Sequence, residues 1–154
     1  MATVYFGCSM RGGFGNVSQE ELQKISGIIE SFGLELATKH NVSKSFVKDE
    51  EKFTKNYIHD RDYQCLKDSD IGIFEISNPS LGVGSEISDM LTLGKPVLCL
   101  YKKGLKESVS AYILGKEKSR FVKTPVECRE YESLLEAEEI IKRFAKKHQG
   151  LSSL

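Results

Sequence analysis

Short apolar runs alternate with longer amphipathic segments along this chain. Residues 3–6, 34–38, 71–76 and 97–100 have the length and the β-branched or aromatic content of buried strands. A fifth strand is predicted over residues 120–123. Because helical segments separate these strands, the pattern predicts an α/β fold, a Rossmann-like (flavodoxin-like) three-layer sandwich with a five-stranded parallel sheet.

Helical periodicity fills the segments between the predicted strands. Ser18 and Glu21 form a capping-box signature, and apolar residues at helical spacing continue from there to a stop at Gly33. Residues 41–54 are polar and weakly periodic, so a mobile connection is expected there. Further helices are predicted over residues 56–68, from Glu86 onward, over 110–114 and over 131–147.

Length and charge narrow the class of protein. The 154 residues fit one domain over residues 1–148, followed by a frayed tail at 149–154. Lys plus Arg and Asp plus Glu both total 22, so neither polymeric nucleic acid nor a membrane is expected as a partner. The four cysteines form no C-x-x-C pair, which predicts reduced thiols and a cytoplasmic location, with the nucleus also open. Neither an export signal nor a membrane-spanning stretch is expected.

The segment 78–86, Asn-Pro-Ser-Leu-Gly-Val-Gly-Ser-Glu, joins a predicted strand to a helix. Free backbone N–H groups at such a junction bind anions, and Gly82 and Gly84 allow a ligand close to the backbone. Glu86 is expected in the first helical turn, where the helix dipole keeps a carboxylate ionised and available as a nucleophile. The simpler interpretation is that Glu86 only complements the helix N-terminus.

Asp62 is the second unusual carboxyl group. Ile58 and Leu66 lie four residues before and after it, which places an acidic side chain on an apolar helix stripe. It could be an Asp satisfied by a neighbouring hydrogen bond. Paired with Glu86, however, it becomes a candidate acid, because two carboxyl groups in one cleft are the minimum for cleaving a glycosidic bond.

Arg11 could bind a phosphate group together with the backbone of the glycine-rich segment around it, or it could be an ordinary solvated loop arginine. The segment lacks the G-x-x-x-x-G-K-[ST] pattern of a P-loop NTPase. His40, His59 and His148 show no metal-ligand spacing, so we expect no metal and no other cofactor.

Taken in order, these features resemble the 2'-deoxynucleoside 5'-phosphate N-hydrolases, which are relatives of the nucleoside 2-deoxyribosyltransferases. The resemblance covers most of the chain. It rests on Val-Tyr-Phe at 4–6 followed by Ser-Met-Arg-Gly-Gly at 9–13, Ile-His at 58–59 leading to Asp62, and Pro-Ser-Leu-Gly-Val-Gly at 79–84 preceding Glu86. Leu-Cys-Leu at 98–100, Ser-Ala at 110–111 and Ser-Arg-Phe at 119–121 extend it.

The resemblance implies that Glu86 attacks C1' of a deoxyribose 5'-phosphate and releases the base, after which water resolves the glycosyl-enzyme. Asp62 and Tyr5 would lie beside the sugar and complete the catalytic set. His40 would lie near the base, and Ser110 would reach the phosphate from the second subunit of a homodimer. The substrate-binding residues implied are Cys8, Ser9, Met10, Arg11, Gly12, Gly13, His40, Ser80, Gly82, Gly84 and Ser110.

The chain departs from the family pattern at one point. The family usually reads Cys-Gly-Ser after the first strand, whereas this chain has Gly7, Cys8 and Ser9. The Cys8 side chain could narrow the sugar pocket or change which nucleotide is preferred. Two alternatives to the hydrolase stay open: a nucleoside 2-deoxyribosyltransferase, and a nucleotide-binding module that does not cleave its ligand.

Overall fold

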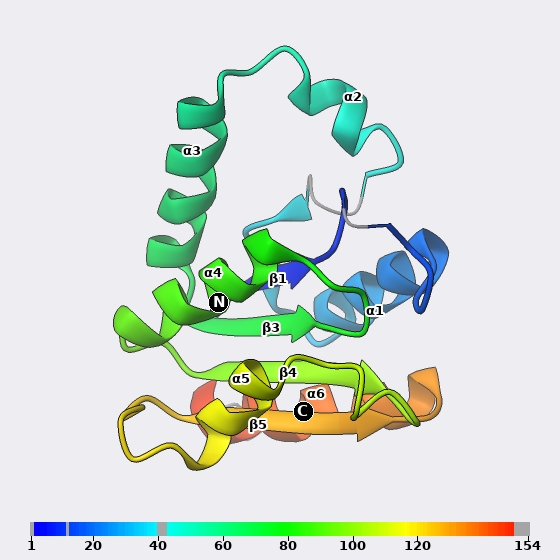
Figure 1. Cartoon of the computed structure of the whole chain (residues 1–154), viewed down its shortest axis with the longest axis vertical. Coiled ribbons are helices and arrows are strands. Elements are labelled where there is room, and N and C mark those ends of the chain that lie inside the picture. The colour runs from blue at the N-terminus through cyan, green and yellow to red at the C-terminus, as the bar shows by residue number, and fades with distance from the viewer. Residues whose placement is uncertain (1, 12, 40–42, 150–154) are drawn as a thin grey trace.

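The computed structural model describes residues 2–11, 13–39 and 43–149. All strands of its five-stranded sheet are parallel, in the order β2-β1-β3-β4-β5 (Figure 1). The strands are β1 (Thr3–Cys8), β2 (Glu35–Leu36), β3 (Ile71–Glu75), β4 (Val97–Lys102) and β5 (Val126–Tyr131). The helices are α1 (Gln19–Ser31), α2 (Phe46–Glu50), α3 (Lys55–Asp68), α4 (Leu81–Thr92), α5 (Ala111–Leu114), the 3₁₀ helix η2 (Gly115–Lys118) and α6 (Leu134–Gln149).

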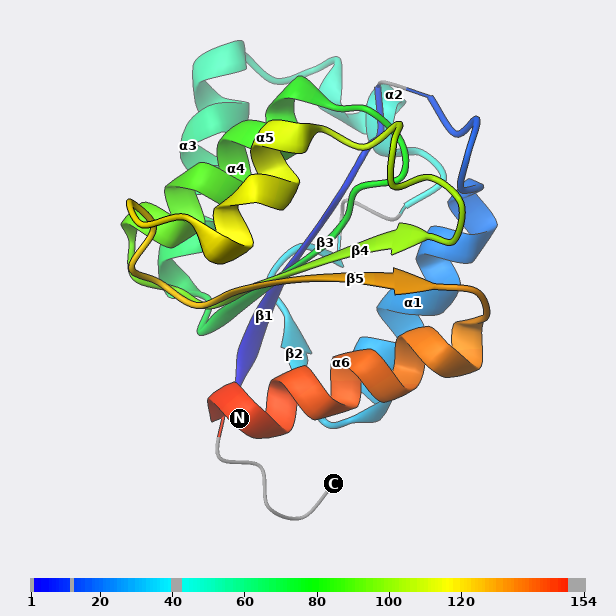
Figure 2. The same ribbon diagram turned by 60° about the horizontal axis from the view of Figure 1, so that its bottom comes forward.

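Helices cover both faces of the sheet, α1 and α6 on one side and α3, α4 and α5 on the other (Figure 2). The side chains along each strand alternate between the two faces of the sheet, and each face has its own core. Phe6 of β1 packs in the core beneath α1 and α6, and Phe74 of β3 packs in the core beneath α4. This arrangement confirms the predicted three-layer parallel α/β sandwich. No helix in the described part of the chain is both long and apolar enough to cross a membrane.

Two predicted elements were wrong. Residues 120–123 form a turn and irregular chain, and the fifth strand is β5, whose last residue, Tyr131, was expected to begin the closing helix. The prediction missed β5 because this edge strand carries charged residues, among them Glu127 and Arg129, which pair with each other at 3.1 Å. Residues 41–54 were expected to be a mobile connection, but they contain α2, whose Phe46 and Glu50 are buried.

One aromatic ring fixes the spacing of β1 and β3 near the centre of the sheet. Phe74 lies opposite Gly7 in the strand register, and Tyr5 lies opposite Gly72. A Cβ atom built on Gly7 would lie 2.4 Å from the Phe74 ring, and one on Gly72 would lie 2.7 Å from it. The ring therefore occupies the space that side chains at both positions would need.

Candidate active site

A cavity of about 1010 Å³ opens beyond the carboxyl ends of β1 and β3. The chain order reverses between these two strands, and open α/β sheets bind ligands at such a switch point. Of the residues expected at the site, nine line this cavity: Cys8, Met10, Arg11, Asp62, Ser80, Gly82, Gly84, Glu86 and Ser110. Of the others, Tyr5, Ser9 and Gly13 are not in its lining, and Gly12 and His40 lie outside the described residues.

The N-terminus of α4 forms the floor of the cavity. The Ser80 hydroxyl accepts a hydrogen bond from the Val83 N–H at 3.3 Å, so the helix begins directly after Ser80. Gly82 and Gly84 therefore lie in the first turn of the helix rather than in a loop. The start of a helix is suited to an anion such as phosphate, and Leu81 and Gly82 of this first turn line the cavity.

Glu86 lies one turn further along α4 than expected. The first turn contains no acidic residue, so the prediction that Glu86 opens the helix was wrong. The prediction of a permanently ionised carboxylate was also wrong. Burial raises the pKa of Glu86 to about 7, and the nearby Asp62 and Asp89 charges act in the same direction. A protonated fraction of Glu86 therefore persists at neutral pH.

Tyr5 lies beneath this carboxyl group, fully buried in β1. Within the described part of the chain, the Tyr5 hydroxyl makes no hydrogen bond that meets the geometric criteria. It nevertheless lies close enough to Glu86 to lower the pKa of that carboxyl group, which partly offsets the rise caused by burial. Burial, followed by the charges of Glu86 and Asp62, raises the pKa of Tyr5 far above its usual range, so Tyr5 stays a neutral donor. The absence of a side chain at Gly7 leaves room for the Glu86 carboxyl group beside β1, because a Cβ atom at Gly7 would lie 3.2 Å from Glu86 Oε2.

Asp62 reaches the cavity from the middle of α3. Its Oδ1 accepts a hydrogen bond from Arg61 Nε at 2.9 Å, so the simple expectation of a satisfied Asp holds. It also lines the cavity and influences the pKa values of Glu86 and Tyr5. The satisfied and functional interpretations are thus compatible. Phe46 and Glu50, which were not predicted at the site, line the same cavity from α2.

Two asparagines join the segments that follow β1 and β3. Asn78 Oδ1 accepts from the backbone N–H groups of Asn16 at 2.8 Å and Val17 at 3.3 Å, and Asn78 Nδ2 donates to Val17 O at 2.9 Å. Asn16 Nδ2 donates in return to Ser77 O at 2.7 Å. The buried Ser9 hydroxyl donates to Pro79 O at 3.3 Å. We call the hydrogen bonds made by Asn16 and Asn78 the asparagine clasp.

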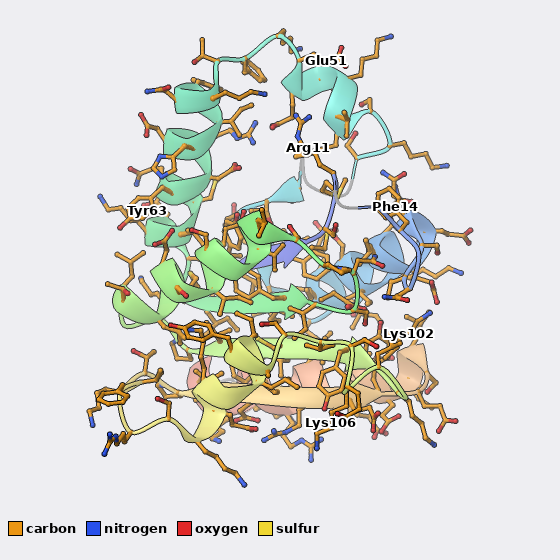
Figure 3. All side chains as sticks on the ribbon, in the orientation of Figure 1. Arg11, Phe14, Glu51, Tyr63, Lys102 and Lys106 are labelled. Carbon is orange, nitrogen blue, oxygen red and sulfur yellow. The ribbon has the colours of Figure 1, made fainter. Side chains whose placement is uncertain are left out.

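Cys8 and Arg11 lie on the segment that leaves β1. The Cys8 thiol is buried and donates to Met10 Sδ at 3.7 Å, and burial raises the pKa of this thiol to about 12. Arg11 is exposed and, in Figure 3, lies between the end of β1 and α2. Among the described lining residues, Arg11 is thus the cation of a cavity that carboxyl groups also line.

Ser110 lines the cavity from the α5 side. Its hydroxyl caps α5 by accepting a hydrogen bond from the Ile113 N–H at 3.4 Å. Two apolar side chains at the same rim are open to solvent, Leu81 at 97% and Tyr112 at 79% exposure. The described chain alone thus leaves an apolar edge beside its cavity.

Comparison with known proteins identifies sequence relatives of this chain. No family model matches the sequence. A protein of Thermofilum pendens named as a 2'-deoxynucleoside 5'-phosphate N-hydrolase is 37% identical over 112 residues, 73% of this chain and 76% of that protein. The 5-hydroxymethyl-dUMP N-hydrolase of Esox lucius is 38% identical over 120 residues, 73% of this chain and 77% of that protein.

Two solved structures share the fold. The CMP N-glycosidase BcmB of Clostridium botulinum matches with a TM-score of 0.62 and 20% identity, over 92% of this chain and 98% of its own. BlsM matches with a TM-score of 0.67 and 16% identity, over 99% and 96% respectively. At such identities the likeness supports the architecture alone.

The fold is that of an α/β protein with a ligand cavity at its switch point, and carboxyl groups of the kind that glycosidases use line this cavity. The sequence relatives then give the family. The chain belongs to the 2'-deoxynucleoside 5'-phosphate N-hydrolase family and is an N-glycosidase.

Proposed function

We propose that this chain hydrolyses 2'-deoxynucleoside 5'-monophosphates through a covalent glycosyl-enzyme on Glu86. The observation that carries the proposal is the buried Glu86 carboxyl, which shares one cavity with Asp62 at the carboxyl edge of the sheet. The relatives named for 5-hydroxymethyl-dUMP and 2'-deoxynucleoside 5'-phosphates support this substrate class. The α4 N-terminus, Ser80 and Arg11 would hold the phosphate.

The reaction proceeds in two displacements. An ionised Glu86 oxygen bonds to C1' while the N-glycosidic bond breaks, and the electron pair of that bond leaves on the base nitrogen. Water then attacks C1', its proton passes to Asp62, and the ester bond to Glu86 breaks. The proton goes on to the released base, so the products are free base and 2-deoxyribose 5-phosphate, with both carboxyl groups restored. Tyr5, a neutral donor beneath Glu86, orients the attacking carboxylate.

The test is base release from a panel of deoxynucleoside monophosphates, with 5-hydroxymethyl-dUMP and CMP included. Glu86→Gln should lose turnover by orders of magnitude and still bind nucleotide, because a nucleophile acts mainly in the transition state. Glu139→Gln, an exposed change on α6, is the matched control. Unchanged turnover in Glu86→Gln would remove the nucleophile assignment, and no base release from any nucleotide would remove the hydrolase.

A competing base separates the hydrolase from the alternatives. A deoxyribosyltransferase would pass the sugar to the added base and prefer unphosphorylated nucleosides, whereas the hydrolase gives 2-deoxyribose 5-phosphate whether or not that base is present. A binding module would release nothing. Intact-protein mass spectrometry during turnover should detect the glycosyl adduct, and Glu86→Gln should abolish it.

We further propose that the chain acts as a homodimer in which Ser110 contributes to the partner's site. The exposed Leu81 and Tyr112 at the cavity rim support this, since a second copy would cover them. Mixing inactive Glu86→Gln with Ser110→Ala tests it by complementation. A mixed dimer holds one site with both native residues only if Ser110 acts across the interface, so recovered activity supports the proposal. Activity no higher than that of the separate variants would argue against it.

We also propose a cytoplasmic or nuclear location. All four cysteines are free thiols, as expected in a reducing compartment. Cell fractionation with an antibody to the chain is the direct measurement. Recovery in a secreted or membrane fraction would contradict the proposal.

A further inference from the structure

The wall of the cavity on the α2 side is one side chain thick. Phe46 and Glu50 line the main cavity and also a smaller cavity of about 350 Å³ behind it. Arg61 lines only the smaller one. This wall is carried by the five-residue helix α2, which an ion pair joins to the fourteen-residue helix α3.

Arg61 is that anchor. Its Nε donates a hydrogen bond to Asp62 Oδ1 at 2.9 Å, and its Nη2 makes ion-pair contacts, without hydrogen-bond geometry among the described residues, to Glu50 Oε1 at 2.6 Å and Asp62 Oδ1 at 2.8 Å. The three side chains are only 20%, 4% and 19% exposed for Arg61, Glu50 and Asp62. Ion pairs this sheltered are screened less by solvent and salt than surface pairs are. One guanidinium thus joins the α2 wall to the carboxyl group that faces Glu86.

We propose that Arg61 is a positioning residue for the N-glycosidase reaction, holding Asp62 and the α2 wall in one arrangement through its guanidinium. The inference rests on the function proposed above. Arg61 acts through Asp62 and Glu50 rather than on the substrate, because it lines only the smaller cavity. It also balances negative charge, because Glu50, Asp62 and Glu86 all line the main cavity, where Arg11 is the one cation among the described lining residues.

The shape of the side chain matters as well as its charge. A guanidinium presents donors in a fixed planar fork and can contact two carboxylates at once, whereas a lysine ammonium is a single point charge on a flexible chain. Arg61→Lys should therefore keep the charge and lose the geometry. Arg61→Gln should lose both. Glu50→Gln should weaken only the link to α2.

These variants separate the two roles in kinetics. We expect Arg61→Gln to lower kcat/KM by about 100-fold, the size of effect that misplacing a catalytic group by about 1 Å can have. Glu50→Gln should mainly raise KM, and adding it to Arg61→Gln should change little, because the link is already broken. Lys67→Gln, an exposed change in the last turn of α3, is the control and should match the wild-type protein.

The pH profile adds a readout that a purely structural role would not move. Among the described residues, the groups that interact with Asp62 include Arg61 and Cys65 on α3, Glu86 on α4 and Tyr5 on β1, with Glu50 beyond Arg61. Arg61 is the cation in this set, so removing it favours protonated carboxyl groups. The acid-side limb of kcat/KM should move to higher pH in Arg61→Gln and stay in place in Arg61→Lys.

Each outcome is decisive once the wild-type protein has been shown to release base. If Arg61→Gln matches Lys67→Gln in kcat, KM and pH limb, the inference is overturned and the proposed function stands. Circular dichroism checks the fold of each variant; if Arg61→Gln unfolds, wild-type kinetics in Arg61→Lys would overturn the geometric role. If the wild-type protein releases no base, the proposed function and this inference both fall.

Discussion

Glu86→Gln should stabilise the fold above neutral pH and change it little in acid. The pKa of the Glu86 carboxyl is about 7 in the folded protein, against 4.5 for an ordinary glutamate. At low pH the Glu86 carboxyl group is protonated in both the folded and the unfolded state, so its burial does not lower the free energy of unfolding. As pH rises through this window the unfolded chain loses its proton first, so folding stability falls. The difference between the two pKa values corresponds to about 3 kcal/mol above pH 7.

Urea unfolding at about pH 4.5 and about pH 8 measures this directly for the wild-type protein and Glu86→Gln. The stability gained by the substitution should grow by about 3 kcal/mol between the two conditions, because Gln has no proton to lose. Glu139→Gln controls for general charge effects and should show no such growth. A gain that is equal at both pH values would refute the claim that Glu86 is a buried, proton-holding carboxyl group.

Three further results are expected. Asp62→Asn should move the acid limb of its residual kcat/KM from near pH 7 to lower pH, because the Asp62 charge raises the Glu86 pKa. The limb should not fall to the pKa of an ordinary glutamate, since burial is the larger cause of the raised pKa. Gly7→Ala should cost about 1–3 kcal/mol in urea unfolding because its Cβ meets Phe74, whereas Gly27→Ala, with open space on α1, should be neutral or stabilising; equal effects would contradict the packing. Asn78→Ala should raise KM for a deoxynucleoside monophosphate more than for its nucleoside, because the asparagine clasp fixes the phosphate-side segments. Equal increases in KM for the monophosphate and the nucleoside would show that the clasp does not act on phosphate binding.

The sheet and most of its helices could be predicted because local patterns encode them. The capping box at Ser18 and Glu21 is present as expected, and the buried strands β3 and β4 show as uninterrupted apolar runs. The edge strand β5 escaped prediction because its charged residues find partners in other elements. Lys147 on α6, for example, contacts Glu127 at 2.7 Å. Pairing of that kind is set by tertiary structure and leaves no period in the sequence.

At the candidate site, residue types were easier to predict than their electrostatics. Glu86 and Asp62 stood out as carboxyl groups on apolar helix faces, and the structure brings both to one cavity. The proton affinity of Glu86 could not be predicted, because it depends on how deeply Tyr5 and α4 enclose the carboxyl group. Arg61 and Glu50 gave no signal either. Each is an unremarkable charged residue until folding places α2 against α3.

The Phe74 ring limits which residues can occupy positions 7 and 72, which lie on the neighbouring strands β1 and β3. Neither Gly7 nor Gly72 has room for a side chain while the ring lies across both. In descendants of this chain, a residue larger than glycine at either position should appear only with or after a smaller residue at 74. Single substitutions at the glycines would cost stability, whereas a smaller residue at 74 would remove the main obstacle at both, leaving Glu86 Oε2 3.2 Å from a Cβ at position 7 and Met90 3.0 Å from one at position 72. The order in which these three positions can change is thus constrained by one ring.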